Sequence, residues 1–334
     1  MTVRFCSHLR LVGGRLALAT ALWTRLALAT ALCALLGALL AAPAGAHRPL
    51  PLPPRPLPQS TSYLALGDSL AFGYSQAKFD ELLPTVPPAD FETGYVNDFA
   101  NVLKLFDPRL QLVNDGCPGE TTESFIHGPC AYVDPDGFTL HHPYAGGPAS
   151  SQLSDALAYL GAHPGNVNPI TIDIGANDAL GLIEGCKEEP ACVLAGAPAT
   201  FAHIGGNLAL ILGELRAAAP HAQIIVLGLY NPFGETLAGG NALTAKLNEV
   251  ETGVAASVGA RFADPLPFFN PPGALEAPTI CLLTNMCTPL VDIHPTDLGY
   301  RVLGGLVLQQ YVLGLPPLQH GPWDAIHVGS RSLP

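Results

Sequence analysis

The sequence predicts one doubly wound α/β domain, covering about residues 61 to 315, built around a parallel five-stranded sheet. Two observations carry this prediction. Short apolar runs alternate with longer segments of helical periodicity, which is typical of a parallel sheet covered by helices on both faces. Hydrophobic residues make up 49% of the 334 residues and charged residues 13%, so the chain has enough apolar material for a packed core of this size.

Five short apolar runs are the predicted strands. The first ends at Gly67 and the third, with the sequence ITIDI, ends at Gly175. The complete set is 63–66, 110–113, 170–174, 224–229 and the weaker 261–263. In sheets of this type, ligands bind beyond the carboxyl ends of the strands. The residues that follow these runs are therefore the first candidates for function.

Four longer segments between and after the strands show helical spacing. They are 151–160, which begins at a Ser cap, 200–219, 241–258, and a last helix that starts near Pro295 and ends near residue 313. Proline suits the first turn of a helix, and the residues that bound the other segments are common helix ends. Residues 123–148 lack periodicity and are rich in Gly, Pro and His. We interpret them as a long loop beside the functional edge, held by Cys130.

The first 46 residues are typical of a secretory signal peptide. They contain four arginines and no acid, an apolar stretch from Leu26 to Ala42, and the small-residue site Ala44-Gly45-Ala46. The alternative is an uncleaved anchor, because this stretch is near the length of about 17 residues needed to span a membrane. We expect cleavage, a Pro-rich linker over 47–60, a C-terminal tail over 316–334, and a secreted product.

Six cysteines remain after the predicted leader is removed: Cys117, Cys130, Cys186, Cys192, Cys281 and Cys287. An even number of cysteines in an exported chain indicates disulfides. The spacing favours pairs of near neighbours, although sequence alone does not choose among the possible pairings. The alternative is a zinc site, but no C-x-x-C or H-x-x-x-H spacing accompanies these residues. We expect neither a metal nor another cofactor.

The charge balance argues against two kinds of partner, nucleic acid and anionic lipid surfaces. The formal net charge is −12, and the chain has no cluster of Lys and Arg. Binding to nucleic acid depends on such clusters to neutralise phosphates, and docking on anionic lipid depends on them in the same way. We therefore expect no nucleic-acid ligand. We also expect no membrane span in the mature form, and a monomer that acts on a small-molecule or lipid ester.

Ser69 follows the first predicted strand in the sequence LGDSL. A serine at a strand-to-helix turn exposes its hydroxyl at the sheet edge, but a hydroxyl is a weak nucleophile and needs an adjacent base. The alternative is that Ser69 only caps the next helix, which Ser does well. The four residues GDSL do not decide between these interpretations.

Three further segments place polar groups at the same predicted edge. Gly119 follows the second strand in NDGCPGET, and Asn177 follows the third in GAND. A glycine lets the backbone approach a ligand and offer its N–H, and an Asn amide donates to an oxyanion. His294 lies in VDIHP before the last helix. Each has an ordinary explanation as a turn glycine, helix cap or loop histidine, but their convergence favours a catalytic site.

These four segments resemble, in their usual order, the four sequence blocks of the SGNH (GDSL) hydrolase superfamily, most closely its secreted bacterial members. The resemblance covers about residues 63–315. It implies a flavodoxin-like three-layer α/β/α sandwich and a serine esterase or lipase that acts on small-molecule or lipid esters. It also implies Ser69 as nucleophile, His294 as base, and an oxyanion hole formed by Ser69, Gly119 and Asn177. The alternatives are a carbohydrate acetylesterase or thioesterase on the same site, or a non-catalytic surface binding protein.

Asp292 departs from the pattern of the superfamily, which places its triad acid three residues before the histidine. That position is Val291 here, and Asp292 precedes His294 by only two. In an extended segment the two side chains would run parallel on one side, so contact with Nδ1 requires a turn. We assign Asp292 the role of triad acid; the alternative is that a backbone carbonyl orients His294.

Other residues receive lesser roles. Asp68 and Asp178 are expected to support the site or to cap helices. The adjacent His141 and His142 are expected in a solvated loop, because the chain has no H-E-x-x-H metal motif. There is no G-x-S-x-G elbow, which disfavours an α/β-hydrolase, and no Lys among residues 116–122 to form a P-loop.

Overall fold

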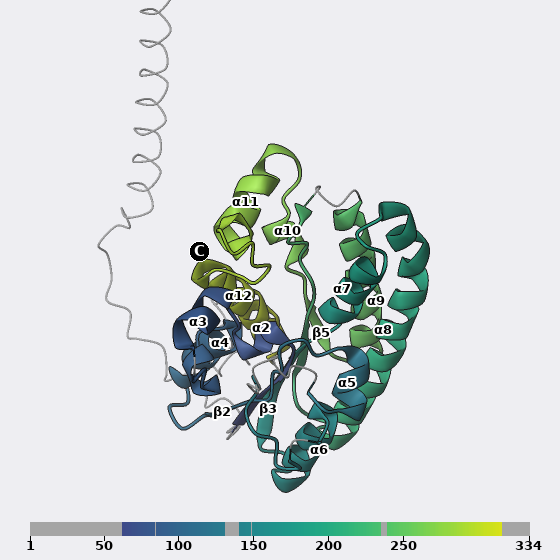
Figure 1. Ribbon diagram of the computed structural model, residues 1–334. Coiled ribbons are helices and arrows are strands. Elements are labelled where there is room, and N and C mark those ends of the chain that lie inside the picture. Colours follow the sequence, from purple (N-terminus) through teal and green to yellow (C-terminus); the bar gives the residue numbers. More distant parts are fainter. Residues whose placement is uncertain (1–61, 84, 131–139, 148, 235–238, 316–334) are drawn as a thin grey trace, which may run out of the picture. The chain divides into compact units, whose positions relative to one another are not determined.

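The computed structural model describes residues 62–83, 85–130, 140–147, 149–234 and 239–315 (Figure 1). Its strands form one parallel sheet in the order β2-β1-β3-β4-β5. They are β1 (Ser62–Gly67), β2 (Gln111–Asn114), β3 (Val167–Asp173), β4 (Ile224–Leu227) and β5 (Arg261–Ala263). This is the strand order of flavodoxin-like folds, in which the ligand-binding switch point lies between β1 and β3. The predicted α/β fold and its five strands are confirmed.

Helices cover both faces of this sheet (Figure 1). Side chains alternate between the faces of a strand, so Tyr63 and Ala65 join one hydrophobic core while Leu64 and Leu66 join the other. The first core is completed by α4 (Tyr95–Lys104) and α12 (Asp297–Gly314). The second is completed by α5 (Thr122–His127), α6 (Gln152–Ala162), α8 (Pro190–Ala218) and α9 (Gly240–Ser257). The sequence therefore builds three layers around two cores.

Short helices follow the carboxyl ends of the strands. They are α2 (Ser69–Phe72) and α3 (Gln76–Leu82) after β1, α7 (Ala176–Gly185) after β3, and α10 (Leu266–Phe269) and α11 (Glu276–Leu283) after β5. Single 3₁₀ turns occur at Pro88–Phe91, Gly273–Leu275 and Asn285–Cys287. These elements, with the loops between them, position the candidate site.

The four predicted helices exist, but two begin elsewhere. Helix α8 starts at Pro190, ten residues before the predicted start, and continues through Pro198. The apolar residues of its first turns, Val193 and Ala197, are buried, so tertiary packing offsets the hydrogen bond that an internal proline removes. Helix α12 starts at Asp297, because Thr296 caps it: the Thr296 hydroxyl accepts a hydrogen bond from the Gly299 backbone N–H.

Helix α4 was missed by the sequence analysis. Its buried residues have helical spacing, namely Tyr95, Val96, Phe99, Ala100 and Leu103. That periodicity is the usual signal of an amphipathic helix, so the information was present.

The segment expected to be a long loop, 123–148, differs from expectation in two respects. Its first residues belong to α5, which begins at a capping box formed by Thr121 and Ser124. The prediction of a solvated histidine pair is wrong for His141. That side chain is buried, its ring lies 4.5 Å from the Tyr144 ring, and its Nδ1 lies 2.6 Å from the backbone oxygen of His142. Residues 131–139 and 148 are outside the described residues.

Helix α8 is long and apolar enough, by length and composition alone, to cross a membrane. Its residues Leu208, Ile211 and Leu215 pack in the core on one face of the sheet. The helix is therefore explained as a core helix of the domain. The predicted leader (1–46), linker (47–60) and C-terminal tail (316–334) lie outside the described residues.

Candidate active site

Ser69 and Asn177 lie on the two sides of the switch point in the sheet. Ser69 is the first residue of α2 after β1, and Asn177 is the second residue of α7 after β3. The turn before Ser69 requires glycine. Gly67 has φ +137°, and a Cβ there would lie 2.2 Å from the backbone oxygen of Asp173. Residue 67 therefore lets β1 pass close to β3 just where the chain turns toward Ser69.

A chain of hydrogen bonds joins Ser69 to a histidine and an acid. His294 Nε2 lies 2.9 Å from Ser69 Oγ, and His294 Nδ1 lies 2.5 Å from Asp292 Oδ1. With the proton on Nδ1 and donated to Asp292, Nε2 carries the lone pair that accepts the serine proton. The three residues that sequence reasoning named are brought together in the order that nucleophilic catalysis requires.

A turn, and not an extended segment, brings Asp292 to the imidazole. Val291 adopts the left-handed backbone conformation with φ +49°, which is uncommon for a β-branched residue. The neighbouring 3₁₀ turn holds the segment, because Asn285 N–H donates to the His294 carbonyl at 2.9 Å and Asp292 N–H donates to the Asn285 carbonyl at 3.3 Å. The expectation of parallel side chains fails here, and the geometry does not need a backbone carbonyl at Nδ1.

The Asp292 carboxylate is held from both sides. Its Oδ1 also accepts the backbone N–H of His294 at 3.1 Å, and its Oδ2 accepts the backbone N–H of Gln76 at 3.0 Å. Burial alone would raise the pKa of Asp292. The hydrogen bond and the charge attraction of the His294 side chain, with the backbone N–H groups of Gln76 and His294, outweigh that effect and lower the pKa of Asp292 below its usual value. Asp292 is therefore ionised at neutral pH and faces the imidazole. Gln76 was not found from the sequence, because its contact joins residues 216 positions apart.

Three potential donors to an oxyanion line the same cavity: Ser69, Gly119 and Asn177. Gly119 has φ +78°, a conformation that favours glycine. The Asn177 amide is oriented by the carbonyl of Glu120, to which Nδ2 donates at 2.9 Å, and by Asp68 Oδ2 at 3.4 Å. The position of Ser69 at the start of a helix leaves its backbone N–H without an intrahelical acceptor.

A buried pair of carboxyl groups supports the serine turn, and one of the two was missed by sequence analysis. Asp173, at the end of β3, accepts the backbone N–H groups of Asp68 and Ala71 at 3.2 and 3.3 Å and the Tyr95 hydroxyl at 2.7 Å. Burial, and then the Asp68 charge, raise the pKa of Asp173 well above its usual value. Asp68 caps α2 by accepting from Leu70 N–H, the supporting role that was expected. A buried Asp at a strand end was the missed signal.

Asp178 connects two of the loops that follow the strands. Its Oδ2 accepts the Thr122 backbone N–H at 2.9 Å, and its Oδ1 accepts the Thr122 hydroxyl at 2.7 Å. This ties the start of α7 to the start of α5. The contact supports the position of neighbouring Asn177 and does not place Asp178 among reacting groups.

The six cysteines form the neighbouring pairs that their spacing favours: Cys117–Cys130, Cys186–Cys192 and Cys281–Cys287. Each disulfide lies in a segment that carries part of the site. The first lies beside Gly119, the second joins the end of α7 to α8, and the third closes the turn that holds His294. The disulfides therefore constrain the loops in which the site residues lie.

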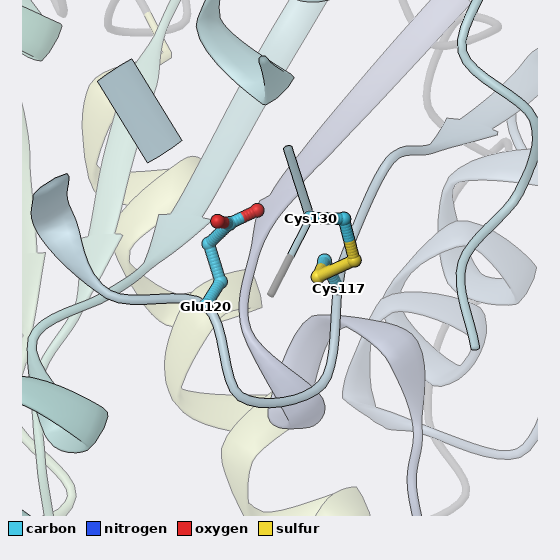
Figure 2. Close-up of side chains that lie close together, drawn as sticks. All are labelled: Cys117, Glu120 and Cys130. Atoms are coloured by element: carbon cyan, nitrogen blue, oxygen red, sulfur yellow. A yellow bond between two sulfur atoms is a disulfide. The ribbon is translucent and has the colours of Figure 1, made fainter. Parts of the chain in front are cut away.

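The Cys117–Cys130 disulfide lies near Glu120 (Figure 2). The potential ligand atoms of these three residues lie within 4.8 Å of one another. Zinc binds thiolates, and the disulfide leaves none. Burial raises the pKa of Glu120 to about 7, although hydrogen bonds from Ser124 and Gln152 oppose that change. As folded, this group does not fit a metal ion.

Comparisons with known proteins find one matching family model and several solved structures of similar fold. The model of the GDSL-like Lipase/Acylhydrolase family matches residues 65–302. A comparison with curated protein sequences finds no match. The structure is similar to an extracellular lipase from Streptomyces rimosus, with 21% identity, coverage of 75% of this chain and 98% of that one, and a TM-score of 0.50. It is also similar to an acetylxylan esterase from Geobacillus stearothermophilus, with 16% identity, coverage of 78% and 98%, and a TM-score of 0.51. At these identities the likeness concerns the fold.

Proposed function

The chain belongs to the GDSL-like Lipase/Acylhydrolase family, and from that premise we propose that it hydrolyses carboxylic esters through an acyl-enzyme on Ser69. The observation that carries this proposal is the continuous hydrogen-bond chain from Ser69 Oγ through His294 to Asp292. A serine hydroxyl becomes an effective nucleophile when a base is within hydrogen-bond reach and a third group orients that base. The family membership supports a hydrolase, and this geometry supports the specific residues.

In the first half of the proposed reaction, Ser69 Oγ forms a bond to the ester carbonyl carbon while its proton moves to His294 Nε2. The carbonyl oxygen becomes an oxyanion, which accepts hydrogen bonds from the Ser69 and Gly119 N–H groups and from the Asn177 amide. The carbon–oxygen bond to the alcohol then breaks, and His294 gives its proton to the leaving oxygen. Asp292 stabilises the imidazolium throughout.

In the second half, a water molecule takes the place of the alcohol. His294 accepts a proton from the water as its oxygen attacks the acyl carbon, and the oxyanion forms again in the same place. Collapse of this intermediate breaks the bond to Ser69 and returns the proton to its hydroxyl. The carboxylic acid leaves, and the site returns to its starting state. The proposed steps need no cofactor.

The decisive experiment is Ser69→Ala, measured as turnover of a short aryl ester with far-UV circular dichroism of both proteins. We expect turnover to be abolished, because the nucleophile is removed, and the spectrum to be unchanged, because the one hydrogen bond found for this hydroxyl among the described residues is to His294. A fluorophosphonate should label wild-type protein at Ser69 and fail to label the variant. Turnover by the variant near that of wild type would end the nucleophile assignment, as would labelling at another serine.

We further propose that the protein is exported, that cleavage after Ala46 leaves His47 as its first residue, and that the hydrolase domain covers residues 61–315. Three disulfides support this, because such bonds persist in oxidising compartments. Amino-terminal sequencing of protein from culture medium tests it. Protein retained in the cell with the leader intact would contradict it.

A further inference from the structure

Helix α7 presents an apolar side that its own domain leaves half-covered. No residue of Ala176–Gly185 is buried, yet the sequence includes Ala179, Leu180, Leu182 and Ile183, all of intermediate exposure. A surface helix of a folded domain normally buries its apolar stripe against the core. Ala179 and Leu182 pack in part against the apolar residues of α8 and α9, and the same side of α7 lines an open space.

That space is a cavity of about 370 Å³ that begins at Ser69 and His294. Beyond these residues its wall consists of α7, the first turns of α8, the loop after β4 and the start of α9. Apolar residues of this wall include Leu182, Val193, Ala197, Phe201, Leu243 and Leu247. The volume lies in the range of sites that bind small molecules, and the lining defines which chemistry is accepted.

The lining includes a few polar side chains besides the catalytic residues, among them Gln76, Asn231 and Thr244. Asn231 Nδ2 donates to the Gly234 carbonyl, and the Thr244 hydroxyl donates to the Gly240 carbonyl. The ionisable acid and base of the lining, Asp68 and His294, both belong to the catalytic end, where Asp68 precedes Ser69 and His294 contacts it. The wall formed by α7 and α8 has no polar side chain beyond Asn177 among the described residues. A sugar or charged group placed there would lose its hydration without hydrogen bonds in return. A hydrocarbon chain would gain from leaving water.

The direction of the cavity assigns it to the acyl side of an ester. The leaving alcohol has to lie beside His294 Nε2, which protonates it, while the carbonyl oxygen points to Asn177. Asn177 is on the first turn of α7, and the apolar wall continues along that helix from Ala179 to Ile183. The group attached to the carbonyl carbon, away from His294, is the acyl chain.

The length of the wall sets the length of the chain. Ala176 and Ile183 are seven residues apart on α7, which is about 10 Å along a helix. An extended hydrocarbon chain covers about 1.2 Å per bond, the same length per bond as an extended polypeptide backbone. The wall therefore accommodates roughly eight carbons.

We propose that this cavity is an acyl-chain site and that the substrates are esters of medium-length fatty acids, a conclusion that rests on the proposed function. Each methylene that leaves water raises kcat/KM about fourfold. For the six additional methylenes of an octanoyl ester over an acetyl ester, the expected gain is on the order of 10³-fold if all are buried. Acetylated carbohydrate, the alternative substrate class, would use none of this wall.

The test is kcat/KM for aryl esters from acetyl to palmitoyl, with wild type, Ala179→Phe, Thr244→Phe and Glu184→Phe. Ala179 and Thr244 line the cavity from α7 and α9, so each added ring shortens the space in a different way. Glu184 is exposed on the same helix as Ala179 and serves as the matched control. We expect the first two variants to lose about tenfold or more on octanoyl ester and to keep acetyl-ester activity within about threefold. The control should match wild type at every chain length.

A binding measurement separates this inference from the catalytic one. Calorimetric titration of Ser69→Ala with octanamide should show binding that acetamide does not, and Ala179→Phe in the same background should weaken it about tenfold or more. A wild-type preference for acetyl ester, or equal losses at all chain lengths in both cavity variants, would overturn the acyl-site proposal while leaving the esterase intact. Absence of turnover and of Ser69 labelling, with octanamide still bound, would instead refute the proposed reaction and support the apolar ligand.

Discussion

Replacing Asp292 by asparagine tests the feature that the structure adds most clearly to the sequence. The substitution keeps the size of the side chain and removes its charge and one acceptor. Asp292 accepts hydrogen bonds from His294 Nδ1 and the His294 N–H on one oxygen, and from the Gln76 N–H on the other. Asparagine has one carbonyl oxygen, so it cannot serve both sides.

Each orientation of the asparagine amide leaves one backbone donor without an acceptor. If its oxygen faces Gln76, the NH₂ group faces Nδ1, the proton moves to Nε2, and His294 no longer accepts the Ser69 proton. If its oxygen faces His294, the NH₂ group opposes the Gln76 N–H. An unpaired buried donor costs about 1–3 kcal/mol of stability. Because both orientations lose the charge that stabilises the imidazolium, we expect kcat/KM to fall by about 10³–10⁴-fold, as for the corresponding change in serine proteases.

The assay is kcat/KM on one aryl ester for wild type, Asp292→Asn, His294→Ala and Asp297→Asn, with thermal unfolding of each. Asp297 is an exposed acid on the first turn of α12 and is the matched control, expected to keep wild-type kcat/KM. His294→Ala should be at least as damaging as Asp292→Asn. A loss below tenfold for Asp292→Asn, with the protein folded, would refute the triad geometry and favour another group as the one that orients His294.

Four further outcomes follow from the structure. Gly67→Ala should lower the stability by on the order of 3 kcal/mol or more, because its Cβ would meet the Asp173 backbone oxygen; wild-type melting would contradict this. Burial raises the pKa of Glu120 to about 7 in the folded protein. The protonated side chain therefore contributes fully to the free energy of unfolding below the pKa of Glu in the unfolded chain, and this contribution is lost as the pH rises through about 7. Glu120→Gln should remove that decline, on the order of 3 kcal/mol between pH 4.5 and 8, which urea titrations at both pH values measure. Replacing Cys117 and Cys130 together by Ser removes a cross-link between residues 13 positions apart and should cost about 3 kcal/mol of stability. An unchanged melting temperature would count against the bond. Dialysis against EDTA should leave ester turnover unchanged, whereas a loss restored by Zn²⁺ or Ca²⁺ would contradict the metal-free reaction.

Sequence alone determined the sheet and the order of the chemical groups around it. The alternation of apolar runs and helical segments is a local property of the chain, since side-chain direction repeats every two residues in strands and every 3.6 in helices. Ser69, Gly119 and Asn177 were found because each follows a strand, and all parallel strands end at one edge. The cysteine pairs, too, are near neighbours in the chain.

Tertiary structure decided the features that join distant segments. The contact between Asp292 and His294 depends on the left-handed backbone of Val291, which the 3₁₀ turn holds in place, and no periodicity in VDIHP encodes it. Asp173 serves the serine turn only because β3 lies beside β1. The acyl-chain cavity is lined by α7, α8, α9 and the loop after β4, which meet beside the sheet edge without filling the space between them. Such an open volume is a property of the positions of packed elements and not of any one segment.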